Sequence, residues 1–230
     1  MKRNFLTKKF IFSLLISALL SFTACKSDED KLAKTASNMK STLNAVEEPK
    51  DVGKENSFAG TLVDRRDGKK YKTVKIGPQT WMAENLNYIS DSSFCYNNEE
   101  GNCVKYGRLY AWSAANSACP AGWHLPSDAE IKILFESVGG IHIAGKRLKS
   151  NKGWKDGGDG TDSFGFSALP AGKRARNGDY YHDGNFTDFW SSTEKNSNNA
   201  NLMHLYYNQS YARMRFDYKS HGLSVRCLQD

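Results

Sequence analysis

The sequence predicts an α+β domain, in which an N-terminal hairpin and two helices precede an antiparallel meander closed by a long disulfide. Three features of the 230 residues support this fold class. Two short strand-like segments flank a turn near residue 66, a helix-capping pattern begins at residue 127, and further strand-like segments follow residue 150. Cysteines in the middle and at the end of the chain would close the meander.

The hairpin is expected over residues 60–63 and 71–76, which are rich in residues that favour strands. The turn between them, residues 65–68, has the sequence Arg-Arg-Asp-Gly, which is typical of a tight connection. A second turn at residues 77–79 leads to the segment that carries Trp81. The domain therefore opens with two antiparallel strands.

Two helices are expected next. The first covers residues 107–118, which are rich in alanine. The second begins with a capping box formed by Ser127 and Glu130, and it ends at Gly139 and Gly140. The apolar residues between these points follow helical spacing, and they are Ile131, Leu134, Phe135 and Val138.

Beyond residue 150, short strands are expected between turns rich in Gly, Asn and Asp. The expected strands are residues 165–169, 189–192, 202–207, 211–216 and 223–227. In the fourth of these, alternation would place Ala212, Met214 and Phe216 on one face. The opposite face would carry Tyr211, Arg213 and Arg215.

The first 24 residues have the three parts of a signal peptide: a basic start, an apolar run over residues 10–20, and small residues before Cys25. The apolar run is shorter than the roughly 20 residues that span a bilayer. Residues 20–25 resemble the bacterial lipobox, in which the cysteine becomes the acylated N-terminus, although Phe22 stands where Leu is preferred. Ordinary secretion with Cys25 as an unpaired thiol is the alternative.

Residues 25–57 contain no aromatic residue, which predicts a flexible tether behind the lipidated cysteine. Residues 26–30 resemble the Lys-plus-acidic signal that sends lipoproteins to the outer face in Bacteroidetes-like bacteria, and a solvated charge run is an equal alternative. We expect a lipid-anchored protein of the cell envelope, in the outer membrane and exposed at the surface. Removing residues 1–24 lowers the formal charge from +7 to +3, which gives no reason to expect nucleic-acid binding.

Aromatic residues begin at residue 58 and continue to the end, so residues 58–230 are expected to form one domain. Its four cysteines, an even number in an exported protein, predict two disulfides. Three pairings are possible, and we favour Cys95 with Cys103 and Cys119 with Cys227. The first closes a short polar loop, and the second ties the middle of the domain to its end.

Seven sequence blocks resemble the Fibrobacter succinogenes major paralogous domain and occur in that family's order. They are GKKYKTVKIG (residues 68–77), QTWMAENLNY (79–88), YGRLY (106–110), CPAGWHLPS (119–127), GFSALPAG (165–172), FWSSTE (189–194) and SVRC (224–227). The resemblance implies a variant of the C-type lectin fold, shared with formylglycine-generating enzymes and phage receptor-binding domains. It also implies the Cys119–Cys227 bridge, and it implies no established activity.

The function that we expect is that of a non-enzymatic binding or adhesion module at the cell surface, with polysaccharide as a candidate ligand. Exposed rings suit stacking on sugar faces, and the domain has more tyrosine and tryptophan than its core needs. The candidate ligand-binding residues are Tyr206, Tyr207, Tyr211, Arg213 and Arg215. Several of the tryptophans would instead pack in the core. A role in envelope assembly, through a basic aromatic surface that binds protein, is the alternative.

No cofactor is expected, with one candidate site for calcium. Asp156, Asp159 and Asp162 lie close together in a loop rich in glycine and offer the oxygen ligands that calcium prefers. Their spacing is not that of an EF-hand, the sugar-binding triplets of calcium-dependent lectins are absent, and a solvated turn is the alternative.

We expect the protein not to be an enzyme. The formylglycine-generating chemistry relies on a pair of reactive cysteines, whereas Cys227 is the only cysteine after Cys119. The five histidines are dispersed without a recognisable catalytic spacing. A hydrolase that used Glu84, Asp188 and Glu194 as its carboxylates is the less favoured alternative.

Overall fold

The computed structural model describes residues 58–230, all of which belong to one compact unit. The predicted signal peptide, the predicted lipidation site Cys25 and the predicted tether lie outside the described residues. Within residues 58–230, no helix has the length and apolar character that crossing a membrane requires.

The predicted N-terminal hairpin is present and supplies two strands of a five-stranded sheet. It consists of β1 (Phe58–Val63) and β2 (Lys70–Ile76), which pair antiparallel. Buried and exposed residues alternate along most of β2, as expected for a strand with one face in the core. The other strands are β3 (Gln79–Met82), β6 (Trp123–His124) and β12 (Leu228–Gln229).

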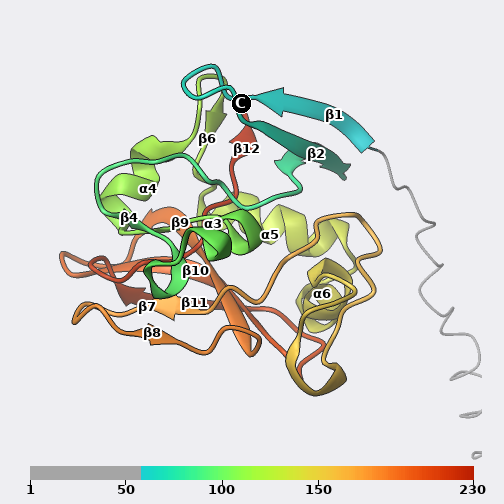
Figure 1. Cartoon of the computed structure of the whole chain (residues 1–230). Helices are drawn as coiled ribbons and strands as arrows, with labels where there is room; N and C mark the ends of the chain where they lie inside the picture. The colour runs from blue at the N-terminus through green and yellow to red at the C-terminus, as the bar shows by residue number, and fades with distance from the viewer. Residues whose placement is uncertain (1–57) are drawn as a thin grey trace, which may run out of the picture. The chain divides into compact units, whose positions relative to one another are not determined.

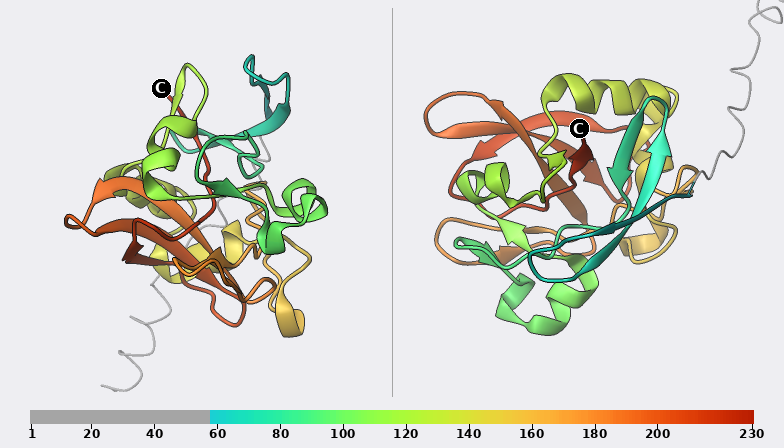
Figure 2. Two further views of the ribbon diagram at one scale, coloured as in Figure 1. Left: turned by 60° about the vertical axis from the view of Figure 1, so that its left-hand side comes forward. Right: turned by 90° about the horizontal axis from the view of Figure 1, so that it is seen from above.

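The last strand of the chain lies inside this sheet. The strand order is β1-β2-β3-β12-β6, so β12 pairs with β3 on one side and with β6 on the other (Figure 1). The view from above shows the C-terminus beside β6 (Figure 2). The two ends of the domain are therefore joined by backbone hydrogen bonds.

Residues 58–230 contain four α-helices, so the prediction of two helices for this domain was wrong. They are α3 (Glu100–Tyr106), α4 (Trp112–Ala118), α5 (Asp128–Ser137) and α6 (Ile141–Leu148). The predicted helix 107–118 begins only at Trp112, because Gly107 has a positive φ and ends α3 instead. Residues 109–110 form β5, which pairs with β4 (Ser93–Phe94).

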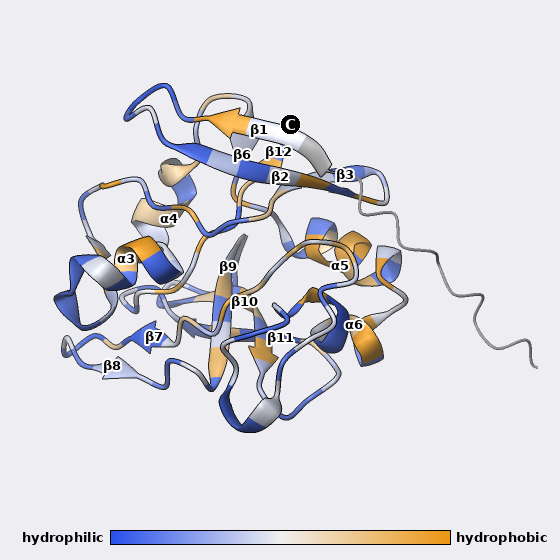
Figure 3. Cartoon of the chain, turned by 45° about the vertical axis from the view of Figure 1, so that its right-hand side comes forward, coloured by the Kyte–Doolittle hydropathy of each residue, from blue (hydrophilic) through white to orange (hydrophobic). Residues whose placement is uncertain are grey.

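The second predicted helix is confirmed as α5. The Ser127 Oγ accepts from the Glu130 backbone N–H, and the Glu130 carboxylate accepts from the Ser127 backbone N–H, which completes the capping box. After α5 ends, Gly140 caps a further helix, α6, which the sequence analysis missed. Hydrophobic and hydrophilic residues alternate around both helices, as Figure 3 shows.

The meander is a three-stranded antiparallel sheet in the order β11-β10-β9. Its strands are β9 (Phe186–Glu194), β10 (Asn199–Tyr206) and β11 (Arg213–Tyr218). A small hairpin precedes it, formed by β7 (Lys173–Arg174) and β8 (Tyr180–Tyr181). Short 3-10 helices η1 (Tyr96–Asn98) and η2 (Lys155–Gly157) complete the secondary structure of the described residues.

Two predicted strands are absent. Residues 165–169 form turns with a single bridge at Ala168, and residues 223–227 make only isolated bridges before β12 begins. Both segments are apolar because they are buried in the core and not because they lie in a sheet. The predicted face of the fourth strand is also partly wrong, since Met214 packs against the core whereas Phe216 is 59 % exposed.

The sheet β11-β10-β9 has apolar clusters on both faces, and a cavity lies over part of one face. One face packs on α5 and α6 through Phe189, Met203 and Leu205. On the other face, Trp190 and Leu202 pack into a second apolar cluster with Cys227. The rest of that second face is polar, and this is where the cavity described below lies.

The two disulfides join Cys95 to Cys103 and Cys119 to Cys227. This is the pairing that the sequence analysis favoured. The first bridge holds the start of η1 against α3, and the second links the end of α4 to the segment that leads into β12.

Candidate functional site

A cavity of about 720 Å³ lies over the polar part of the sheet β11-β10-β9. Strand alternation produces it, because Asp188 of β9, His204 of β10 and Arg213 of β11 are direct neighbours across the ladder and share one face. The hairpin β7–β8 and the segment before β9 supply further wall residues, which are Lys173, Ala175, Tyr181, His182 and Asn185.

A buried carboxylate–imidazole pair forms the floor of the cavity. The Asp188 Oδ1 lies 2.6 Å from the His204 Nδ1, and the two side chains are only 7 % and 9 % exposed. Phe186 and Tyr206 flank the His204 ring, with centroids 5.5 and 5.9 Å away. The imidazole is therefore held in place by its hydrogen bond and by contact with two aromatic rings.

A second carboxylate of the cavity, Asp217, is also paired. The Lys173 Nζ lies 2.8 Å from its Oδ2, and the His221 Nδ1 lies 2.9 Å from its Oδ1. Burial opposes ionisation of Asp217, but the close contact with His221 and the hydrogen bond from Lys173 outweigh burial and lower the pKa of Asp217 to about 2. Asp217 is therefore ionised at neutral pH, and the hairpin β7–β8 is tied to β11.

Two arginines on the edge strand β11 have no carboxylate partner among residues 58–230. Arg213 donates a hydrogen bond to the Tyr211 hydroxyl, and its guanidinium lies 4.7 Å from the centre of the Tyr211 ring. Arg215 lies two residues further along the same face, where it too lines the cavity. The cavity wall therefore carries two uncompensated positive charges.

The structure brings together only part of the predicted binding set. Tyr206, Arg213 and Arg215 line the cavity. Tyr207 points to the opposite face, where it packs against the core, because successive side chains of a strand alternate. Tyr211 contacts Arg213 from outside the cavity lining.

Sequence reasoning missed most of the remaining wall. Asp188 and His204 were considered only as a possible hydrolase carboxylate and as one of five dispersed histidines. Phe186 was not considered, Tyr181 was counted only among the surplus aromatic residues, and His182 was another of the dispersed histidines. The alternation of Leu202, His204 and Tyr206 along one strand was the available signal, since it places a histidine and a tyrosine on one face.

The three aspartates of the calcium candidate do not gather around one point. Asp159 accepts a hydrogen bond from the Trp154 backbone, and Asp162 accepts two from Ser167. Asp156 is paired only with Lys155, at 4.0 Å. No group of three or more His, Cys, Asp or Glu side chains with the arrangement of a metal site occurs within residues 58–230. Asp159 and Asp162 accept hydrogen bonds from loop backbone instead.

The three carboxylates of the hydrolase alternative have separate partners. Asp188 contacts His204, and Glu194 contacts Lys219 at the end of β9. The Glu84 carboxylate accepts from the Lys72 backbone N–H in a different cavity. The structure therefore does not place these three residues in one cavity.

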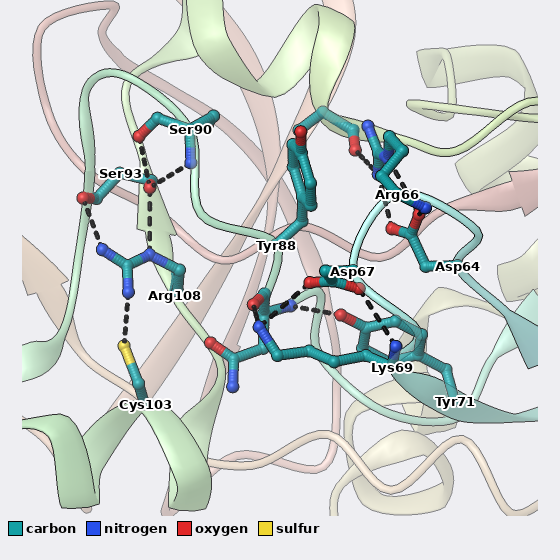
Figure 4. Close-up of polar contacts among 12 residues, drawn as sticks. Asp64, Arg66, Asp67, Lys69, Tyr71, Tyr88, Ser90, Ser93, Cys103 and Arg108 are labelled. Atoms are coloured by element: carbon teal, nitrogen blue, oxygen red, sulfur yellow. Dashed lines mark hydrogen bonds and ion pairs between the residues drawn. The ribbon is translucent and has the colours of Figure 1, made fainter.

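That second cavity, of about 670 Å³, is lined by β2, α3 and residues 164–169. It contains Lys69, Lys70, Lys72 and Lys105. Figure 4 shows how Lys69 is occupied, since its Nζ lies 3.1 Å from Asp67 and also donates to the Asn87 carbonyl. The aromatic residues of this cavity, Tyr71, Tyr106 and Phe164, are all buried. With no accessible ring, it is less suited to a sugar than the cavity over β9–β11.

The comparisons with known proteins give one match. The family described as the Fibrobacter succinogenes major domain matches residues 74–229. No curated protein and no solved structure matches the chain.

Proposed function

Since this chain belongs to the Fibrobacter succinogenes major domain family, we propose that it is a non-enzymatic binding module for polysaccharide, anchored to the cell surface by a lipid on Cys25. The observation that carries the proposal is the cavity over β9–β11, where aromatic rings stand beside hydrogen-bond donors. Sugar-binding sites need both, because the C–H face of a sugar packs on a ring and its hydroxyls need polar partners.

The accessible rings of this cavity are Tyr181, Tyr206 and Phe216. Tyr206 stacks with one face on His204, at an interplanar angle of 23°, so its orientation is fixed before any ligand arrives. Pre-organised aromatic groups lose little conformational freedom on binding, which favours affinity. Tyr206 is therefore the residue on which we expect a sugar ring to stack.

A non-enzymatic role is part of the proposal. Asp188 and Asp217 are the carboxylates of the cavity, and each already contacts a histidine. Acid–base hydrolysis of a glycosidic bond usually needs two carboxyl groups that flank the scissile bond. Because Asp188 and Asp217 each already contact a histidine inside the protein, we expect the cavity to bind its ligand without cleaving it.

The lipid anchor and the outer-membrane surface location are also proposed. They rest on the signal peptide, the lipobox-like residues 20–25 and the polar tether. Metabolic labelling with palmitate should mark the wild-type protein and not the Cys25→Ala variant. Protease added to intact cells should degrade the domain if it faces the medium, and protection from protease would contradict surface exposure.

We also propose that the fold is a C-type-lectin-like variant. Its support is the long Cys119–Cys227 bridge and the pairing of the last strand, β12, with β3 of the N-terminal sheet. A crystal structure of the domain that superimposes on C-type lectins over both sheets would establish it. A different strand order in that crystal structure would contradict it.

The function is tested by retention of the purified full-length protein on insoluble cellulose and xylan and by a glycan array. We expect retention on at least one polysaccharide and a loss of about tenfold in affinity for Tyr206→Ala, since stacking on one ring contributes roughly 1 kcal/mol or more. Tyr218→Ala is the matched control, because Tyr218 is 57 % exposed on β11 but does not line the cavity. No retention on any polysaccharide would contradict the proposal.

One observation favours a second candidate function, protein interaction. The strand β11 lies at the end of its sheet, with no strand paired to its outer edge among the described residues. An exposed edge with Phe216 and Tyr218 would accept a strand from another protein. Its arginines oppose this, because charged edge residues discourage strand pairing. A pull-down from an envelope extract that retains a protein and no polysaccharide would favour this second function.

A further inference from the structure

We infer that the ligand of the cavity is an acidic polysaccharide, whose carboxylates are bound by Arg213 and Arg215. This inference rests on the proposed function and names the class of ligand. It follows from the charges on the cavity wall. Both carboxylates there already have partners inside the protein, since the Asp188 Oδ1 lies 2.6 Å from the His204 Nδ1 and the Lys173 Nζ lies 2.8 Å from the Asp217 Oδ2.

The two arginines, in contrast, form no ion pair with a carboxylate of residues 58–230. Arg213 contacts the hydroxyl and the ring of Tyr211, and Arg215 has no hydrogen-bond partner within residues 58–230. Two uncompensated guanidinium groups repel each other, and an anionic ligand would relieve that repulsion. A neutral sugar would accept their hydrogen bonds but would leave both charges unpaired.

The spacing of the arginines suits a polymer that carries repeated carboxylates. They are two residues apart on one face of β11, so their backbone positions lie roughly 6.6 Å apart. The guanidinium fork binds a carboxylate through two parallel hydrogen bonds, which gives geometric selectivity. Two such forks along one strand would contact two acidic groups of the same chain.

The rings of the cavity explain why the anion is expected on a sugar. Tyr206 lies in the strand next to β11 and lines the same cavity as both arginines. Phe216 follows Arg215 directly and is 59 % exposed. A sugar ring that stacks on Tyr206 would direct a ring carboxylate to the cavity wall formed by β11. Inorganic anions would use the arginines and leave the rings unoccupied.

The experiment compares three probes on the purified full-length protein: polygalacturonate, the same polymer with its carboxylates methyl-esterified, and cellulose. We expect binding to polygalacturonate that is at least about tenfold tighter than binding to the ester, since a charge-assisted hydrogen bond is worth about 1.5–3 kcal/mol. Equal binding to the ester or to cellulose would overturn the inference and leave the proposed polysaccharide function standing. Binding to none of the three, with no glycan retained on the array, would contradict the proposed function itself.

Two double variants test whether polygalacturonate binds at this site or is attracted to the positive charge of the protein in general. Arg213→Gln with Arg215→Gln should weaken polygalacturonate binding by about tenfold or more. Lys70→Gln with Lys72→Gln removes the same charge from the exposed lysines of the other cavity and should leave binding within about twofold. Equal losses in the two double variants would overturn the assignment to β11. All four substitutions are at exposed positions, and circular dichroism checks that each variant is folded.

A competition experiment tests whether a carboxylate is preferred over other anions. Polygalacturonate should displace a fluorescent oligogalacturonide at a lower charge concentration than dextran sulfate does. If dextran sulfate competes equally well or better, the site binds any polyanion, and the assignment to carboxylates is wrong.

Discussion

The Asp188 Oδ1 lies 2.6 Å from the His204 Nδ1, across the ladder between β9 and β10 at the floor of the cavity. Both side chains are largely buried, and the His204 ring also contacts the rings of Phe186 and Tyr206. This hydrogen-bonded pair fixes the His204 ring on which Tyr206 stacks. The pair therefore supports the proposed binding surface by positioning Tyr206, without needing to contact the ligand itself.

We expect Asp188→Ala to lower the free energy of unfolding by about 3 kcal/mol, because removing one member of a buried polar pair leaves the other without a partner. Urea denaturation at neutral pH measures this change. Glu194→Ala is the control, since it removes the surface ion pair with Lys219 and should change stability by less than about 1 kcal/mol. Equal effects of the two substitutions would show that the Asp188–His204 pair contributes no more than a surface pair.

The two disulfides should differ in their effects on stability. Chain-entropy estimates give about 4.8 kcal/mol for a loop the length of Cys119–Cys227 and about 2.5 kcal/mol for one the length of Cys95–Cys103. Their sequence separations are 108 and 8 residues. We therefore expect the double alanine variant of the long bridge to lose about twice as much stability in urea denaturation as that of the short bridge. A larger loss from the short bridge would contradict this account.

The stability of the domain should depend on pH through His124. Its Nδ1 lies 2.6 Å from Asp230 and its Nε2 2.9 Å from Glu130, and both nitrogens donate only in the imidazolium form. Burial opposes the charge, but the hydrogen bonds to Asp230 and Glu130 outweigh burial and raise the pKa of His124 above its ordinary value of 6.5. This stabilisation is therefore complete below pH 6.5 and is lost as the pH rises through the raised pKa.

Denaturation of the wild type and of His124→Gln between about pH 6 and pH 9 tests this dependence. The stability difference between the two proteins should shrink as the pH rises. The pKa of Glu130 is lowered, despite burial, by its hydrogen bonds to Ser127 and His124, so its contribution is lost only at a pH below this range. If the stability difference between the two proteins stays constant with pH, the pKa of His124 is not raised in the folded protein.

Arg226 should be essential for stability. Its side chain is buried and donates to the carbonyls of Met82, Phe166 and Ser167 and to the Asn85 side chain. Each buried acceptor left without a donor costs about 1–3 kcal/mol, so we expect Arg226→Met to destabilise the domain by about 3 kcal/mol or more.

Thermal and urea denaturation measure this loss, with Arg65→Met as the control. Arg65 is exposed in the β1–β2 turn, so its substitution should stay within about 0.5 kcal/mol of the wild type. Wild-type stability in Arg226→Met would mean that the apolar side chain compensates for the lost hydrogen bonds.

Removal of calcium should not change the melting temperature or polysaccharide binding. Asp159 and Asp162 already accept hydrogen bonds from their own loop, and these bonds form without a metal. We expect Asp162→Asn to lower stability by about 1 kcal/mol whether or not EDTA is present, through the contact with Ser167. A melting temperature that falls when EDTA is added would contradict this expectation.

Local sequence patterns were sufficient for the elements whose signals are short-range. The capping box at Ser127 and Glu130 predicted the start of α5, and the turn of residues 65–68 predicted the β1–β2 hairpin. The helices that were missed lacked such signals. The helix α3 follows Glu99, which makes no side-chain cap, and α6 begins after a glycine. Apolar residues at 165–169 and 223–227 suggested strands, because apolar content alone does not distinguish a sheet from a buried loop.

The sequence by itself determined the family and the α+β class. It identified Tyr206, Arg213 and Arg215, three residues of the candidate site that lie within 10 positions of one another. Only the tertiary structure decided that Asp188 contacts His204, that Asp217 is paired with Lys173, and that Arg215 has no such partner within residues 58–230. The physical reason is that charge compensation depends on the register between strands and on a distant hairpin, neither of which spacing along the chain can specify.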